Sequence, residues 1–145
     1  MKKSFTLIEI LVVSTIIVLL TATAVVTYSA FLKQSRDARR KSDLEQVRAA
    51  VEMYRSNNDT YPITIAEGAS LCDPVGCPPA GSKYLEKFPS DPKNLTYKYY
   101  YSGSASNYTL GAQLETTSSC TSPPGGNSCG TGNPCNYCIG PYGQK

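Results

Sequence analysis

The chain contains one long apolar segment, Phe5–Leu32, in which Glu9 is the only charged residue. As a helix, these 28 residues would extend about 42 Å, which exceeds the roughly 30 Å hydrocarbon layer of a bilayer. The segment therefore predicts a membrane-spanning helix that continues beyond the bilayer. Because Lys2 and Lys3 precede it, the positive-inside rule places the N-terminus in the cytoplasm and the residues after Leu32 outside.

Glu9 is the residue of this segment that requires an explanation. A charge at the centre of an inserted helix costs about 2.5–3.5 kcal/mol on insertion scales, and the segment contains no Lys or Arg to pair with it. The partner of Glu9 is therefore expected to be the chain terminus or another subunit. A secretory signal peptide cleaved after Ala22-Thr23-Ala24 and a plain signal anchor are alternative interpretations, but neither explains Glu9.

The start of the segment resembles a known class of export signal. Ser4, the string Phe5-Thr6-Leu7-Ile8-Glu9 and the apolar run that follows are similar to the class III signal of type IV pilins and type II secretion pseudopilins. In that family a prepilin peptidase cleaves on the cytoplasmic side and methylates the new amine. The resemblance implies a leader of residues 1–4, cleavage between Ser4 and Phe5, and N-methylation of Phe5. Most relatives have Gly before the cut, where this chain has Ser4.

The same resemblance implies how the chain assembles. Glu9, together with Thr6, would form the assembly site, and Glu9 would pair with the Phe5 amine of a neighbouring subunit, an interaction that is strong in a low dielectric. The implied partners are further copies of the chain in a helical filament, the prepilin peptidase, a membrane platform protein and an assembly ATPase. Membrane lipid would surround the helix before assembly.

The helix is expected to continue after the apolar segment, over residues 33–60. These residues are polar but carry an apolar stripe at helical spacing, formed by Leu44, Val47, Val51 and Tyr54. No Pro or Gly occurs between Phe5 and Tyr61, so the sequence predicts one helix of about fifty residues that ends near Asn57-Asn58-Asp59. The stripe is predicted to pack on a globular head.

A cluster of basic residues lies early in this second part of the helix: Arg36, Arg39, Arg40 and Lys41. We interpret the cluster as a solvated helix face. The alternatives are contacts with lipid phosphates at the membrane surface and binding of nucleic acid along a filament, where weak contacts would add up.

Residues 61–145 are predicted to form the head, which makes the fold class α+β. We expect a connecting loop at 63–82, a short helical turn or strand at Lys83–Phe88, and a β-hairpin at 95–115 with strands Leu95–Ser102 and Asn107–Glu115. The hairpin would cover the helix stripe. Its alternating tyrosines indicate cross-strand packing, with an electron-transfer or ligand-stacking surface as the alternative. The pattern YLEKFPSDP followed by the hairpin is similar to the Pro-Asp-Pro turn and antiparallel sheet of major pseudopilins.

The tail, residues 116–145, has almost no aliphatic side chains and must be fixed covalently or by an ion. It contains Cys120, Cys129, Cys135 and Cys138, and the head also contains Cys72 and Cys77. Because the topology places the head outside the membrane, we predict three disulfides. Cys72 would pair with Cys77, and the three possible pairings of the other four stay open. A zinc site or a redox pair at the Cys135-x-x-Cys138 motif is the alternative.

Several function classes are disfavoured by what the sequence lacks. The chain has no His, which removes the commonest general base and neutral metal ligand, and it has no phosphate-binding loop. Many major pseudopilins bind calcium through acidic residues of the C-terminal loop, whereas here no Asp follows Asp91 and Glu115 is the only later acid. We therefore expect no metal, no cofactor and no enzymatic activity.

The sequence favours a structural subunit of a type IV pilus-type filament that polymerises through its N-terminal helix. A pseudopilin of a type II secretion or DNA-uptake system is the alternative of the same kind. A membrane-anchored or secreted disulfide-rich binding domain, and an extracytoplasmic thiol-disulfide enzyme using Cys135 and Cys138, are alternatives of other classes.

Overall fold

The computed structural model describes residues 5–73, 81–116, 120, 128–132 and 134–144. The predicted leader, including Ser4, and Cys77 lie outside these residues. The chain divides into two compact units, Met1–Ser35 and Arg36–Lys145. The apolar segment lies in the first unit, and the amphipathic part of the helix and the head form the second.

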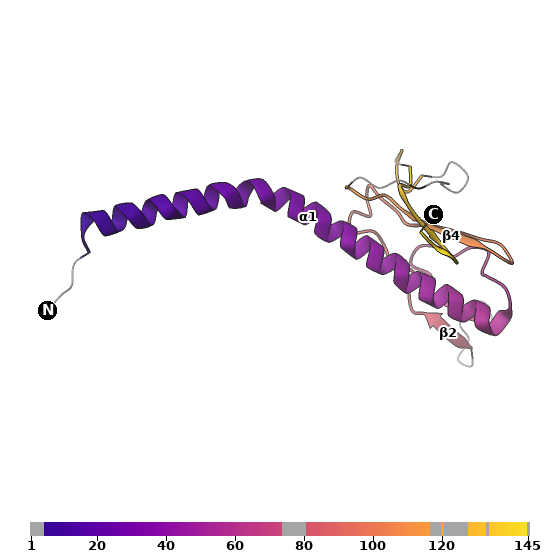
Figure 1. The fold of residues 1–145 in the computed structure, drawn as a ribbon. Helices are drawn as coiled ribbons and strands as arrows, with labels where there is room; N and C mark the ends of the chain where they lie inside the picture. Colours follow the sequence, from indigo (N-terminus) through magenta and orange to yellow (C-terminus); the bar gives the residue numbers. More distant parts are fainter. Residues whose placement is uncertain (1–4, 74–80, 117–119, 121–127, 133, 145) are drawn as a thin grey trace. The chain divides into compact units, whose positions relative to one another are not determined.

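Helix α1 runs without interruption from Leu7 to Asn58 (Figure 1). The helix ends at Asp59, which has a positive φ of 58° and whose N–H donates to the Arg55 carbonyl at 2.8 Å. Asp tolerates this left-handed conformation, which is a common way to end a helix. The stretch Leu7–Val25 has a mean hydropathy of 2.4 and is long and apolar enough to cross a membrane. The prediction of one continuous helix is confirmed.

The strands form two antiparallel sheets. The smaller sheet pairs β1 (Leu71–Asp73) with β2 (Ser82–Leu85). The larger sheet has the order β3-β4-β5-β6, formed by Tyr100–Gly103, Tyr108–Ala112, Tyr137–Gly140 and Gly143–Gln144. Its register places Tyr101, Leu110 and Ile139 in one row across three strands. The larger sheet is therefore a simple meander in which strands that follow one another in the chain are neighbours.

The predicted hairpin is present, but both of its strands are shorter than expected. The second strand is Tyr108–Ala112 and not Asn107–Glu115, because its pairing with β5 ends at Ala112. The first strand is shortened at its start. This strand begins at Tyr100 and not at Leu95, because residues 93–97 form a turn in which the Lys93 carbonyl accepts hydrogen bonds from the Thr96 and Tyr97 N–H groups. Residues 82–85 form a strand, which is one of the two possibilities that we gave for this region.

Two expected loops contain strands. The predicted loop at 63–82 includes β1, which pairs with β2. The tail supplies β5 and β6, so the expectation of a tail without burial was wrong. All four residues of β5 are buried, because this strand pairs with β4 and is covered on both faces.

The core lies between the second half of α1 and one face of the larger sheet. Leu44, Val47 and Val51 are fully buried, and Tyr54 packs against them from the edge. Side chains alternate between the two faces of a strand, and those that face the helix are Tyr99, Tyr101, Tyr108, Leu110, Ala112, Tyr137 and Ile139. The α+β fold with a helix packed on an antiparallel sheet is confirmed.

The tyrosines of the hairpin are structural side chains with satisfied hydroxyl groups. The Tyr99 hydroxyl donates to Asp43 at 2.8 Å, and the Tyr108 hydroxyl donates to Glu52 at 2.9 Å, so both reach carboxylates of α1. Tyr101 and Tyr108 stack across the two strands with centroids 6.2 Å apart. This arrangement agrees with the cross-strand packing that we inferred from their alternation.

Candidate assembly site and the interactions that hold the head

Thr6 and Glu9 form a capping box at the start of α1. Glu9 Oε2 accepts hydrogen bonds from the Thr6 N–H at 2.8 Å and from Thr6 Oγ1 at 2.7 Å, and the Glu9 N–H donates to Thr6 Oγ1 at 3.3 Å. In this motif each side chain satisfies a backbone N–H that the first helical turn leaves free. The Glu9 carboxylate therefore has a partner within its own chain, which we did not foresee. The Thr-x-x-Glu spacing in the sequence could have predicted this capping box.

The surroundings of the capping box are apolar and open. The side chains of Phe5 and Leu7 are more than four-fifths exposed. Among the described residues, only Thr6 bonds to the Glu9 carboxylate, through Oε2. The other carboxylate oxygen is thus available to a donor from a second molecule.

Arg40 is the centre of a buried ion cluster, and our interpretation of it as part of a solvated face was wrong. The side chain is fully buried. Its Nε and Nη2 donate to the two oxygens of Asp91 at 2.7 and 2.9 Å, and its Nη1 donates to Asp37 at 2.7 Å and to Glu115 at 3.2 Å. The planar guanidinium thereby bonds three carboxylates, and the pair with Asp91 is bidentate.

Two further cations complete the cluster. Arg36 forms two bonds with Glu115, at 2.6 and 2.8 Å, and the Lys93 ammonium donates to Glu115 at 2.8 Å. The cluster therefore contains three cations and three carboxylates, so its charges balance. It joins the helix to the turn at Asp91 and to the chain that follows β4. We call these six residues the Arg40 cluster.

Asp37 also holds the start of the tail. Its carboxylate accepts hydrogen bonds from the Glu115 N–H at 2.9 Å, from the Thr116 N–H at 2.8 Å and from the Thr116 hydroxyl at 2.6 Å. Because the lone pairs of this nearly buried carboxylate are satisfied, its burial carries no unpaired charge.

Within the Arg40 cluster, the pKa values of Arg36, Arg40, Asp37 and Glu115 are shifted in the directions that favour charge. Burial by itself would lower the pKa of Arg40, but the hydrogen bonds to Asp91 and Asp37 outweigh it and raise that pKa further. The hydrogen bond from Arg36, helped by Lys93 and Arg40, holds the pKa of Glu115 far below its usual value. Burial raises the pKa of Asp37, yet the hydrogen bonds from Thr116 and Glu115 reverse this and lower it.

These shifts predict that acid destabilises the head. The folded pKa values of Asp37 and Glu115 are depressed, so their contribution to stability is full above their ordinary values of 3.8 and 4.5 and is lost as the pH falls below them. The free energy of unfolding should be nearly constant from pH 7 to about pH 5 and should then fall by up to about 1.4 kcal/mol per pH unit for each carboxylate. Urea unfolding of the full chain in detergent at a series of pH values would measure this. Glu115→Gln should reduce the slope, and an unchanged slope in this variant would contradict the assignment.

The basic cluster of the sequence thus separates into two parts. Arg36 and Arg40 are neutralised by carboxylates, whereas Arg39 and Lys41 are exposed, with the Lys41 ammonium 5.4 Å from the Tyr137 ring centroid. Two of the four cations are therefore not available to bind lipid phosphates or nucleic acid. Both of these alternatives lose support.

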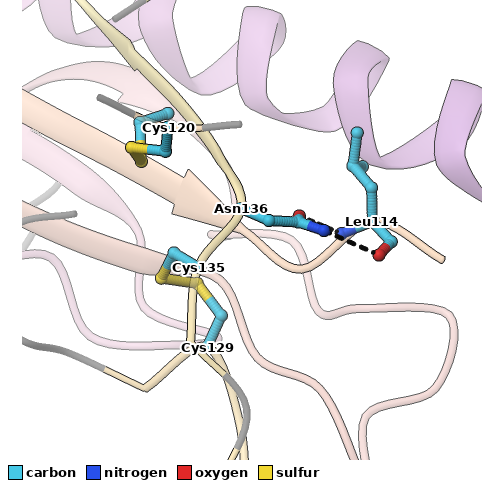
Figure 2. Close-up of a disulfide and its surroundings, with 6 residues drawn as sticks. Leu114, Cys120, Cys129, Cys135 and Asn136 are labelled. Carbon is cyan, nitrogen blue, oxygen red and sulfur yellow. Dashed lines mark hydrogen bonds between the residues drawn. A yellow bond between two sulfur atoms is a disulfide. The ribbon is translucent and has the colours of Figure 1, made fainter. Parts of the chain in front are cut away.

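A cluster of sulfur atoms covers the outer face of the larger sheet. Disulfides join Cys120 to Cys138 and Cys129 to Cys135, and Cys129, Cys135 and Cys138 are buried (Figure 2). Tyr100 packs against this group from β3. A Cβ atom at Gly111 would lie 3.0 Å from the Cys135 sulfur, so a glycine allows the disulfide to approach the sheet closely. One face of the larger sheet therefore packs on the apolar core, and the other face is covered by the disulfides.

Asn136 continues the pairing of β4 and β5 with its side chain. Its Nδ2 donates to the Leu114 carbonyl at 3.0 Å, and its Oδ1 accepts from the Leu114 N–H at 2.6 Å, as Figure 2 shows. The Asn136 N–H donates to the Ala112 carbonyl at 3.1 Å. The amide thereby replaces a backbone residue of the ladder at the point where the two strands separate.

The two cysteines of the C-x-x-C motif have different partners. Cys135 is bonded to Cys129 and Cys138 to Cys120, so the motif is neither half of a zinc site nor a redox pair in this state. Both alternatives for this motif are overturned. Cys72 is disulfide-bonded as well, and its predicted partner Cys77 lies outside the described residues.

The residues of the tail do not fit a calcium site. Both oxygens of Glu115, the only acid after Asp91, bond cations of the Arg40 cluster. The described parts of the chain contain no group of three or more His, Cys, Asp or Glu residues that could hold a metal. The buried Gln113 Oε1 has no hydrogen-bond partner, but a single amide oxygen is far from the six to eight oxygen ligands that calcium takes.

The head should consequently be insensitive to chelators. We expect EDTA and added calcium each to shift the melting temperature of the full chain in detergent by less than about 1 °C, because the residues that the structure describes bring no three such ligands together. A thiol reductant serves as the positive control and should lower the melting temperature. A clear decrease in EDTA alone would show that a cation contributes to the fold.

The fold and these sites define a pilin-like protein: an apolar helix that begins with a capping box, continues as an amphipathic helix under an antiparallel sheet, and ends in a disulfide-bonded tail. Comparison with protein families finds that residues 28–117 match the family described as Type II secretion system (T2SS), protein G. The chain belongs to this family.

Curated relatives support the same assignment. The chain is 34% identical to the Type II secretion system core protein G of Pseudomonas aeruginosa over 120 residues, covering 77% of this chain and 84% of the relative. It is 28% identical to the protein of the same name from Escherichia coli K12 over 114 residues, covering 75% and 79%. A comparison with solved structures gives no match. The family assignment thus agrees with the pseudopilin, which we had given as the alternative to a type IV pilus subunit.

Proposed function

We propose that this chain is the filament subunit of a type II secretion machine and that it polymerises through its apolar helix after leader removal. The observation that supports this most directly is the capping box of Thr6 and Glu9 at the start of an exposed apolar helix. Membership of the protein G family supports the secretion machine as the setting.

Cleavage between Ser4 and Phe5 would create the group that Glu9 recognises. The amine of Phe5 is positive at neutral pH, and Thr6 leaves one Glu9 oxygen without an intramolecular bond. In the filament interior, an amine from a neighbouring subunit would approach this oxygen. A subunit in the wrong register would leave both charges unpaired at a cost of several kcal/mol, so the pair would select the correct register.

The topology in this proposal has the N-terminus inside and the head outside the cytoplasmic membrane. Lys2 and Lys3 support it through the positive-inside rule. The proposed partners are the prepilin peptidase, the platform protein, the assembly ATPase and further copies of this chain. The chain has no phosphate-binding loop, so we assign the mechanical work to the ATPase and propose no enzymatic activity for this subunit.

The N-terminus of the mature protein tests this proposal. Mass spectrometry of the protein from membranes should find a chain that begins with N-methylated Phe5. A mature chain that begins at Val25 would identify a conventional signal peptide, and a chain that retains Met1 or Lys2 would identify a plain anchor. Either result would overturn the proposal.

The capping box gives a prediction for Thr6. Thr6→Val keeps the shape of the side chain but removes the hydroxyl that caps the helix, which should cost about 1 kcal/mol and loosen the first turn. We expect roughly fivefold less filament in a sedimentation assay, because 1 kcal/mol corresponds to about that factor. Thr6→Ser retains the hydroxyl and should assemble normally. Equal assembly of the valine and serine variants would contradict a role for the cap.

A further inference from the structure

The two described disulfides of the tail are nested. Cys120–Cys138 spans 18 residues and encloses Cys129–Cys135, which spans 6. Pairing the same four cysteines in chain order, Cys120 with Cys129 and Cys135 with Cys138, would close loops of 9 and 3 residues. Each of these loops is half as long as its native counterpart. Once Cys129–Cys135 has formed, its 6 residues no longer count toward the outer loop, so the three-halves dependence of loop closure on length favours the consecutive pairing in the unfolded chain by about fourfold.

The order in which the tail reaches an oxidant favours the same wrong pairing. Under the topology of the proposed function, on which this step rests, the chain crosses the membrane from residue 33 onward. Cys120 and Cys129 are then exposed to an oxidant before Cys135 and Cys138 arrive. Thiols that are close in the unfolded chain and already outside react first.

The native pairing depends on the sheet. Cys138 lies in β5 opposite Gly111 of β4, and the Cys135 sulfur packs on that glycine. The sulfurs are therefore brought to their native partners only when β5 has docked on β4. Tyr137 and Ile139 are the described side chains that the tail adds to the apolar core, so little apolar surface drives this docking before the disulfides exist. Oxidation is expected to precede folding of the tail.

We propose that the tail is a substrate of a thiol–disulfide isomerase outside the membrane, which converts the consecutive pairing into the nested one. Four thiols first lose four protons and four electrons to a protein disulfide oxidant, which is reduced to dithiols. An isomerase thiolate then attacks Cys135 of the Cys135–Cys138 bond, forms a mixed disulfide and releases the Cys138 thiolate.

Two exchanges complete the conversion without net oxidation. The Cys138 thiolate attacks Cys120, which forms Cys120–Cys138 and releases the Cys129 thiolate. This thiolate attacks Cys135 in the mixed disulfide, which forms Cys129–Cys135 and returns the isomerase thiolate. Each step breaks one disulfide and forms one.

Burial of the cysteine sulfurs in the folded head makes the conversion proceed from the consecutive to the nested pairing. Cys129 and Cys138 are fully buried and Cys135 is nearly so in the folded head. An isomerase thiolate must reach a sulfur to attack it, so once β5 has docked the buried sulfurs of Cys129, Cys135 and Cys138 are protected, and of these four cysteines only the partly buried Cys120 can be reached. The consecutive pairing cannot place Cys138 and Cys135 on β4 in this way and stays open to attack.

The test follows the pairing during oxidation of the full chain. Cys72→Ala and Cys77→Ala are introduced so that four cysteines remain, and the reduced, unfolded protein is oxidised in detergent with a small disulfide oxidant, quenched with acid and mapped by peptide mass spectrometry. We expect about fourfold more consecutive than nested pairing at early times. A catalytic amount of protein disulfide isomerase should convert it to the nested pairing. Direct appearance of the nested pairing at the same rate with and without isomerase would overturn the proposal.

A matched variant separates isomerisation from general assistance to folding. In the same background, Cys129→Ala and Cys135→Ala leave only Cys120 and Cys138, for which one pairing exists. This variant should oxidise at the same rate with and without isomerase, and acceleration by isomerase would contradict the proposed role. The N-terminus of the same samples is measured separately, so a failure of the filament proposal at Phe5 and a failure of the isomerase proposal are distinguishable.

Discussion

Replacing Glu9 with alanine is expected to abolish filament formation while the chain still inserts into the membrane. In the proposed filament the alanine removes the carboxylate that would receive the Phe5 amine, and breaking one side of a buried ion pair leaves the other charge uncompensated at a cost of about 3–5 kcal/mol. This corresponds to a loss of more than a hundredfold in assembly. Electron microscopy and sedimentation measure the filaments, and carbonate extraction of membranes measures insertion.

The variant Glu9→Gln separates charge from capping. A glutamine amide oxygen can still accept the hydrogen bonds that Thr6 donates to Glu9, so the start of the helix should be preserved. The negative charge is lost, and assembly should fail as it does for the alanine variant. Normal filaments from Glu9→Gln would show that the carboxylate acts only as a cap.

Replacing Arg40 with methionine is expected to destabilise the head by about 3–5 kcal/mol. The methionine fills similar space but leaves the buried carboxylate of Asp91 without its bidentate partner, and one unpaired buried charge accounts for a loss of this size. A domain has a total stability of about 5–15 kcal/mol, so the loss is a large part of the whole. Urea unfolding of the full chain in detergent would measure it.

Arg39 provides the matched control for Arg40. It is adjacent in sequence and exposed, so Arg39→Met should change stability by no more than about 0.5 kcal/mol. Arg40→Lys keeps the charge but not the planar fork and should lie between the two. Equal stability of the Arg39 and Arg40 variants would contradict the role of the cluster.

The Arg40 cluster shows what the sequence could and could not predict. Arg40 lies four residues before Leu44, so helical spacing places it on the buried stripe, and this signal was available. Its charge suggested that the side chain is exposed to solvent, because a buried arginine needs carboxylates to pair with it. Those carboxylates include Asp91 and Glu115, which are 51 and 75 residues away in the chain. Contacts at such separations are decided by the tertiary fold.

The difference between contacts close in sequence and contacts far apart also explains which strands could be predicted. The hairpin of β3 and β4 was predictable because its partners are close in sequence and alternate regularly. Strand β5 has only four residues, and it is defined by pairing with β4 and by the sulfur atoms of Cys138 and Cys120. The sequence predicted disulfides for the tail but left their connectivity open, and the nested pairing is the one that accompanies β5 docked on β4.

One interval of the tail is anchored at its start to helix α1 and at its end to the chain that follows β4. The Asp37 carboxylate binds the N–H groups of Glu115 and Thr116, and the Asn136 side chain binds Leu114. The interval from Thr116 to Asn136 thus begins and ends beside one stretch of backbone. Doubling the length of a loop with closed ends costs only about 0.6 kcal/mol. Insertions between Cys120 and Cys129 are therefore expected to cost the head little stability.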